Sequence, residues 1–223
     1  MYVRRSDYLE LEELGGVPMA TAATLLVELA RDLTLVDLVP MVDCALAGGA
    51  TVEELLAACR RRTRGVRTLR RAIELGDSRS ESWWESVLRV MHVVTGLGPV
   101  EAQVDVADEN GTFVGRADLH LVGTDRYPEC DGGDHRTAEQ HGRDLRRDKA
   151  MSRRGAERYG YTTQEIAHSA AMIIRDAEDA RGWPHDPGRI STWNRLARTS
   201  TLTGHGRARL HARLRRYQLA AQR

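Results

Sequence analysis

Residues 115–135, GRADLHLVGTDRYPECDGGDH, constrain the fold most, because they carry acidic side chains at the ends of two short predicted strands. Residues 111–121 alternate apolar and polar side chains at a period of two, which is typical of a β-strand. One face carries Phe113, Ala117, Leu119 and Leu121. Asp118 falls on the opposite face, since successive side chains of a strand point to opposite sides.

A turn at residues 123–125 permits a second strand over residues 126–131, in which Glu129 and Asp131 project from one face. A hairpin of this kind brings both carboxylates close to Asp118. Like-charge repulsion in such a cluster is usually offset by a divalent cation or a shared proton, and Mg²⁺ is the natural candidate. The alternative is that the three acids are solvent-facing residues of an edge hairpin.

The ordered set of Glu85, Asp118, Glu129-Cys130-Asp131-Gly132 and His135 resembles the PD-(D/E)XK nuclease superfamily. Within it, the chain is most similar to the branch related to very-short-patch-repair endonucleases. The closest likeness is to actinobacterial proteins that carry this domain behind a helical segment resembling the type IV, abortive-infection antitoxins. The resemblance covers residues 19–166.

This resemblance implies an α/β fold with a restriction-endonuclease-like core, in which helices flank a mixed β-sheet. It also implies a metal-dependent endonuclease that hydrolyses phosphodiester bonds of DNA in repair, restriction or phage defence. In this family a helix packs on the sheet and directs a glutamate towards the metal centre. Glu85 is the matching position here.

Phosphodiester hydrolysis needs an activated water, neutralised phosphoryl oxygens and a proton donor. Asp118 and Glu129, with the backbone carbonyl of Cys130, are the expected ligands of Mg²⁺ or Mn²⁺. Asp131 is a further catalytic candidate, because it stands where the wider superfamily keeps a lysine. His135 is the expected general acid or base, since an imidazole titrates near neutral pH. The alternative for His135 is a loop histidine without a role.

Upstream of this region, apolar side chains recur at helical spacing over residues 21–47, with Leu25 and Leu29 among them. The pattern predicts two helices of a small bundle whose leucines pack in the core. Pro40 is expected to bend or end the second helix, because proline lacks a backbone N–H.

Two capping boxes predict where further helices begin. Thr51 with Glu54 opens a third helix through residue 59, and Ser78 with Glu81 opens a helix over residues 77–94. The later pattern predicts strands at 101–107, 111–121, 126–131 and 161–166, and helices at 137–158 and 166–180. We therefore divide the chain into an antitoxin-like helical segment (1–76), a nuclease-like domain (77–166) and a basic tail (167–223).

Arginine is concentrated in two places, and like charges in such runs repel unless something neutralises them. Seven arginines lie between residues 60 and 71, and after Asp186 the chain has nine arginines and no acidic residue. A phosphate backbone would neutralise both groups of arginines. The alternatives are a solvated helix face for the first group and a disordered, solvated tail for the second. The expected nucleic-acid contacts are Arg60, Arg61, Arg62, Arg64, Arg67, Lys149, Arg207, Arg209 and Arg213.

Composition narrows the class of protein. Three separated cysteines form no CxxC pair, which fits a reducing cytoplasm better than a disulfide framework. No apolar run approaches the roughly 20 residues of a membrane span. Lys149 either supplies the positive charge that the wider superfamily has at the position of Asp131, or is an ordinary surface lysine. Two functions stay open: a Mg²⁺- or Mn²⁺-dependent DNA endonuclease, and a non-catalytic nucleic-acid-binding regulator, with a homodimer among the assemblies to test.

Overall fold

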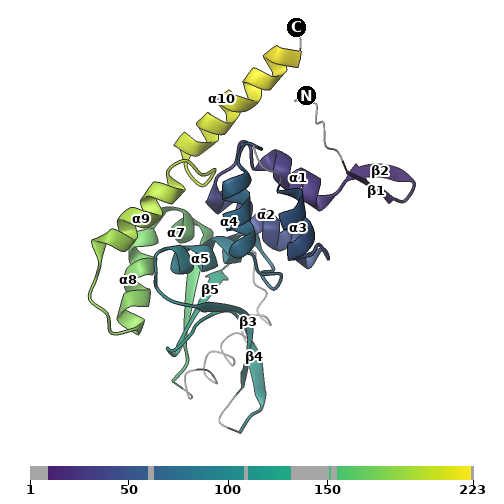
Figure 1. Cartoon of the computed structure of the whole chain (residues 1–223). Helices are drawn as coiled ribbons and strands as arrows, with labels where there is room; N and C mark the ends of the chain where they lie inside the picture. Colours follow the sequence, from purple (N-terminus) through teal and green to yellow (C-terminus); the bar gives the residue numbers. More distant parts are fainter. Residues whose placement is uncertain (1–9, 60–62, 108–109, 132–150, 152–154, 222–223) are drawn as a thin grey trace, which may run out of the picture. The chain divides into compact units, whose positions relative to one another are not determined.

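The computed structural model describes residues 10–59, 63–107, 110–131, 151 and 155–221 (Figure 1). The chain divides into two compact units. Unit 1 comprises Met1–Ser78 and Asn194–Arg223, and unit 2 comprises Arg79–Trp193. The first boundary lies near the expected junction at residues 76 and 77, and the segment that we treated as a tail is shared between the two units.

Unit 1 is built from a hairpin and a set of helices, of which the first four in the chain lie together in Figure 1. The hairpin pairs β1 (Leu11–Leu14) with β2 (Val17–Ala20) in antiparallel register. The helices are α1 (Ala22–Leu29), α2 (Leu35–Ala47), α3 (Val52–Ala58), α4 (Val66–Glu74) and, from the C-terminal segment, α10 (Gly204–Ala221).

The predicted capping box of α3 is confirmed: the Thr51 N–H donates to Glu54 and the Glu54 N–H donates to the Thr51 hydroxyl. Pro40 lies inside α2 and does not end it. The helix continues because apolar residues on both sides of the proline, such as Leu38 and Val42, are fully buried. Their burial outweighs the hydrogen bond that proline cannot make.

The core of unit 1 contains Leu26, Leu38 and Leu69, all nearly inaccessible to solvent. The prediction that every periodic leucine packs inside is wrong for Leu25 and Leu29, which are 49% and 38% exposed. Helix α1 has eight residues and buries a narrow face around Leu26. Leu25 and Leu29 are four residues apart and therefore share a different stripe of the helix.

Unit 2 is a mixed α/β arrangement. Helix α5 (Trp83–Val94) packs on three strands, β3 (Val100–Ala107), β4 (Phe113–Leu121) and β5 (Arg126–Asp131). Strands β3 and β4 are antiparallel, and β5 runs parallel to β6 (Glu157–Thr162). Next come α7 (Thr163–His168), α8 (Ala170–Ala180) and α9 (Pro187–Ala197), and the unit boundary falls within α9.

Three predictions about these elements need correction. Helix α5 begins after Ser82, whose hydroxyl accepts from the Glu85 N–H, and not at Ser78, because Ser82 and Glu85 have the same cap spacing closer to the apolar run. The last strand ends at Thr162 because a capping box with Glu165 starts α7 there. Phe113 is 63% exposed, at the end of the ladder where a bulge shifts the register.

The predicted helix over residues 137–158 falls mainly outside the described residues, and its last two positions belong to β6. The predicted helix over residues 166–180 is instead the two helices α7 and α8, which meet at Ser169. In the part of the chain that the structure describes, no helix has both the length and the apolar character required to cross a membrane.

Asp37 links two distant segments of unit 1. Its Oδ2 accepts from the Thr34 N–H and hydroxyl at 3.1 and 2.6 Å. Its Oδ1 accepts from the Ser200 hydroxyl, and from the N–H and hydroxyl of Thr201, at 2.7 to 2.8 Å. The side chain is 1% exposed. A buried carboxylate that satisfies this many donors is costly to replace, because each abandoned donor stays desolvated.

Asp37→Asn should therefore lower the free energy of unfolding by about 3 kcal/mol, since an amide directs two donors at groups that are themselves donors. Equilibrium urea unfolding followed by circular dichroism measures this loss. The control is Glu74→Gln, because Glu74 forms an exposed ion pair with Arg71 and should cost less than about 1 kcal/mol. Equal losses of unfolding free energy in the two variants would contradict the conclusion that the hydrogen bonds of Asp37 hold residues 200 and 201 against α2.

Candidate active site

Asp118 extends from β4 to the neighbouring strand. Its Oδ2 accepts a hydrogen bond from the backbone N–H of Cys130 on β5 at 2.9 Å. Strands β4 and β5 lie in contact, yet among the described residues the backbone ladders join β1 to β2, β3 to β4 and β5 to β6. The carboxylate of Asp118 thus supplies a hydrogen bond between β4 and β5.

Glu129 and Asp131 project towards β6, where Arg158 contacts both. Arg158 Nε donates to Glu129 Oε2, and Arg158 Nη2 lies 3.8 Å from Asp131 Oδ1. Glu129 is 3% exposed. The guanidinium therefore offsets the charge of a nearly buried carboxylate and lies within ion-pair distance of the second.

Gly160 makes room for Asp131. It pairs with Glu129 in the parallel register of β5 and β6. A Cβ added at Gly160 would lie 2.1 Å from Asp131 Oδ2, well inside van der Waals contact. The carboxylate of Asp131 therefore lies directly against the backbone of β6, which a larger residue at position 160 would obstruct.

Glu85 lies in the first turn of α5 and is 8% exposed. Its Oε2 accepts from the Glu81 N–H and from Gln103 Nε2, both at 3.0 Å. A donor from the loop before α5 and another from β3 fix the orientation of this carboxylate.

Gln103 is a residue that the sequence did not single out. It stands on β3 between the register pairs of Ala102 with Leu119 and Val104 with Ala117, so the residue opposite it is Asp118. Its φ of 54° makes it the one non-glycine residue with positive φ among those that the structure describes. Such strained backbone is concentrated at functional sites. Gln103 therefore donates a hydrogen bond to Glu85 from the position on β3 that faces Asp118 on β4.

The thiol of Cys130 reports on the surrounding charge. Burial raises the pKa of Cys130 to about 11, with further increases from the negative charges of Asp118, Glu85 and Asp131. These carboxylates come from α5, β4 and β5. We call Glu85, Asp118, Glu129 and Asp131 the acidic cluster. That Asp118, Glu129 and Asp131 gather at one metal site stays a prediction.

The donor set of the acidic cluster consists of hard oxygens, which are the ligands that Mg²⁺ and Mn²⁺ prefer. The chemistry of these residues therefore fits a divalent cation. In the described ranges, however, no group of three or more His, Cys, Asp or Glu side chains lies at metal-ligating distance. Glu129 instead binds Arg158, a residue that no sequence pattern singled out.

Several expected site residues lie outside the described residues: His135, Lys149, Arg60, Arg61 and Arg62. Of the other expected nucleic-acid contacts, Arg64, Arg67 and Arg209 are exposed. Arg207 Nη1 donates to the carbonyls of Thr201 and Leu202.

Arg213 is half-buried against Asp32. Its Nη1 donates to the Asp32 carbonyl at 3.3 Å, and its Nε lies 3.7 Å from Asp32 Oδ1. Arg213 therefore helps to hold α10 in unit 1, and Arg207 stabilises the turn before that helix. Removing the C-terminal segment would consequently disrupt unit 1, so point substitutions are the better test of its arginines.

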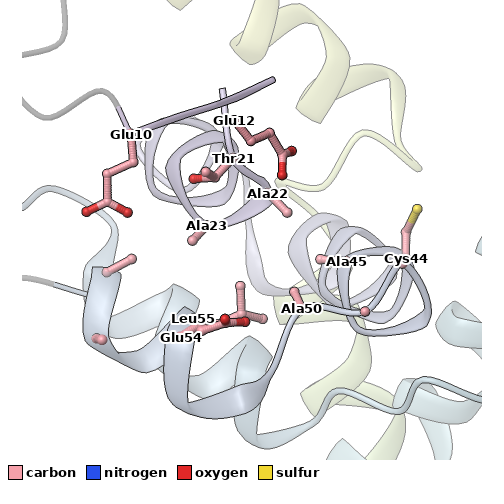
Figure 2. Close-up of a pocket in the computed structure, with 14 residues that line it drawn as sticks. Glu10, Glu12, Thr21, Ala22, Ala23, Cys44, Ala45, Ala50, Glu54 and Leu55 are labelled. Carbon is pink, nitrogen blue, oxygen red and sulfur yellow. The ribbon is translucent and has the colours of Figure 1, made fainter. Parts of the chain in front are cut away.

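A separate hollow lies within unit 1, between the hairpin and helices α1, α2 and α3 (Figure 2). Its volume is about 750 Å³, and its walls combine small side chains such as Ala23 and Ala45 with Glu10, Glu12 and Glu54. The acidic cluster belongs to unit 2. The hollow in unit 1 is therefore not part of the candidate active site.

Comparison of the chain with family models, curated proteins and solved structures gives no match.

Alkylation of Cys130 tests the acidic cluster directly. The thiolate reacts, so below a pKa of about 11 the rate should rise about tenfold per pH unit. Asp118→Asn removes a negative charge, lowers the pKa and should speed the reaction with iodoacetamide at pH 8 about three- to tenfold. Mass spectrometry of the Cys130 peptide measures the rate. Asp125→Asn, an exposed change in the turn before β5, is the control, and equal rates in both variants would contradict the cluster.

Proposed function

We propose that this protein is a divalent-metal-dependent endonuclease that hydrolyses phosphodiester bonds of DNA. The observation that supports the proposal is the position of Asp118, whose carboxylate on β4 accepts a hydrogen bond from the Cys130 N–H on β5, between Glu129 and Asp131 in the sequence. Glu85 and Glu129 are nearly buried, and keeping carboxylates in such surroundings is unfavourable unless their charge is compensated or has a use.

The order of the elements also supports the proposal. Helix α5 precedes the antiparallel strands β3 and β4, and β5 is followed by the parallel strand β6. This order is the one expected for a restriction-endonuclease-like core. We therefore propose that core for unit 2, with Asp118 and Glu129 on adjacent strands.

In this proposal Asp118, Glu129 and the carbonyl of Cys130 hold Mg²⁺ or Mn²⁺. The bound ion would supply Lewis-acid stabilisation of the phosphoryl oxygens and lower the pKa of a water. Gln103 and the Glu81 N–H orient Glu85 beside the site. We assign proton transfer to the leaving oxygen to His135, because an imidazole changes protonation near neutral pH.

A second candidate is a non-catalytic nucleic-acid-binding, antitoxin-like regulator that keeps the nuclease fold. One observation favours it: Glu129, an expected metal ligand, is engaged by Arg158. In this second candidate the arginines bind the phosphate backbone, and the acidic cluster does not catalyse hydrolysis. Cleavage and binding measured on the same protein separate the two candidates.

Cleavage of supercoiled plasmid tests the enzyme. The wild type should nick or linearise the plasmid with Mg²⁺ or Mn²⁺ and not with EDTA. Asp118→Asn should reduce the rate about 10³-fold, because a lost ligand removes several kcal/mol of transition-state stabilisation. Asp125→Asn is the matched control and should cut like the wild type. If the wild type binds DNA but never cleaves it, the regulator is the better description.

The exposed arginines of α10 should contribute phosphate contacts. Arg209 and Arg216 are seven residues apart and both exposed, so they share one helix face. Changing both to Gln should weaken binding of all DNA sequences alike and reduce the slope of log affinity against log salt by about 0.9 for each lost contact. Fluorescence anisotropy measures both quantities.

The control for this pair is Arg71→Gln, because Glu74 already compensates the charge of Arg71 at 2.8 Å. Its affinity and salt slope should stay close to those of the wild type. An unchanged slope in the double variant would mean that the α10 face is solvated and does not contact the backbone.

A further inference from the structure

The turn between α1 and α2, residues 30–34, is the place where two arginine-rich segments of unit 1 meet. One segment leads into α4, and the other is α10. They lie far apart in the sequence, and both belong to unit 1. The sequence shows two separate groups of arginines, so their meeting at one turn is a property of the fold.

The start of α4 lies directly against this turn. Gly65, the N-cap of α4, has a φ of 83°, and a Cβ added to it would lie 1.8 Å from the carbonyl oxygen of Ala30 and 3.0 Å from the backbone nitrogen of Arg31. Glycine alone combines this φ with so close an approach. Arg64 and Arg67 stand on either side of Gly65 in the chain, and both are exposed. Their charges therefore lie near the turn.

Helix α10 reaches the same turn from the other end of the chain. Arg213 Nη1 donates to the Asp32 carbonyl at 3.3 Å, and the Tyr217 hydroxyl donates to the Asp32 carboxylate at 3.0 to 3.1 Å. Arg209 and Arg216 stand four residues before and three residues after Arg213, so they are its neighbours on the helix surface. Both are exposed.

Arg31 lies in the turn itself and has an incompletely satisfied guanidinium. Its Nε is buried without a hydrogen-bond acceptor, and its Nη1 lies 3.8 Å from Glu28 Oε1, which is too long for a hydrogen bond. The four exposed arginines on either side have no carboxylate partner in the ranges that the structure describes. A desolvated donor without an acceptor is unfavourable, and neighbouring like charges repel. The turn therefore concentrates positive charge that the described part of unit 1 leaves uncompensated.

We propose that these side chains form one continuous surface for the phosphate backbone of a DNA duplex, with Arg31 at its centre. We call this surface the arginine junction, and it comprises Arg31, Arg64, Arg67, Arg209 and Arg216. A duplex carries one negative charge per about 1.7 Å of its axis, so one helical turn of DNA offers phosphates to both segments together. The inference rests on the proposed function for the identity of the partner, and it assigns the binding of that partner to unit 1.

Fluorescence anisotropy with duplexes of about 10 and about 30 base pairs tests the arginine junction, in EDTA so that nothing is cleaved. The short duplex is about 34 Å long, and two surfaces that face apart could not share it. Arg31→Gln should weaken binding of both duplexes about three- to tenfold and reduce the slope of log affinity against log salt by about 0.9. Arg31→Lys keeps the charge and should keep the slope.

Paired substitutions of exposed arginines test the junction without touching the turn. Arg64→Gln with Arg67→Gln, and Arg209→Gln with Arg216→Gln, should each weaken binding of the short duplex about tenfold or more and lower its salt slope. The matched control is Arg71→Gln, because Arg71 lies on the same helix as Arg67 and is paired with Glu74 at 2.8 Å. Its affinity and slope should equal those of the wild type.

Two results would overturn the inference. One is a pair of substitutions that affects the long duplex and leaves the short duplex unchanged, because the two segments would then bind DNA at separate places. The other is an Arg31→Gln protein that melts like the wild type and binds both duplexes like the wild type. If Arg31→Gln does not fold, the paired variants decide the question on the short duplex.

The outcomes also separate this inference from the proposed function. If the variants lose affinity as described and the wild type cleaves no DNA, the arginine junction is real and the nuclease proposal fails. If the wild type cleaves plasmid with Mg²⁺ and all these variants bind the short duplex like the wild type, the nuclease proposal stands and the arginine junction does not exist.

Discussion

The ion pair between Arg158 and Glu129 is the interaction on which the arrangement of the candidate site depends. Glu129 is almost completely buried, and a carboxylate in that environment requires a nearby cation or a change of protonation. The cation comes from β6, which runs parallel to β5 and follows it in sequence only after a long crossover. The parallel register also places Gly160 beside Glu129, where it accommodates Asp131. One charge requirement thus connects the fold of unit 2 with the chemistry of its acidic residues.

Part of this arrangement could be predicted because it is encoded locally. Strand β5 has the predicted bounds, since a turn and alternating side chains specify a short strand without reference to the rest of the chain. The capping box at Thr51 needs four consecutive residues and is present. The predicted hairpin of β4 with β5 was wrong, because among the described residues these strands share no backbone ladder and are joined by the bond from the Cys130 N–H to the Asp118 carboxylate.

The remaining features depend on contacts that no local pattern encodes. Arg158 is one arginine among many, and its importance follows from a register between strands that are distant in sequence. Gln103 becomes conspicuous through its positive φ and its bond to Glu85, neither of which glutamine as a residue type suggests. The start of α5 was misplaced because two serines offer equivalent caps, and packing of the apolar helix face decides between them. Tertiary contacts therefore decided between structures, such as the two possible helix starts, that the local sequence favours equally.

The hydrogen bonds of Asp37 have a consequence for the order of folding. They join α2 to residues 200 and 201, so unit 1 is assembled from the two ends of the polypeptide while unit 2 occupies one uninterrupted stretch between them. On the ribosome, all of unit 2 emerges before the segment that completes unit 1. Domains generally fold as units during synthesis, and contacts between distant residues form late. Unit 2 can thus reach its native structure before residues 194–223 are available to complete unit 1.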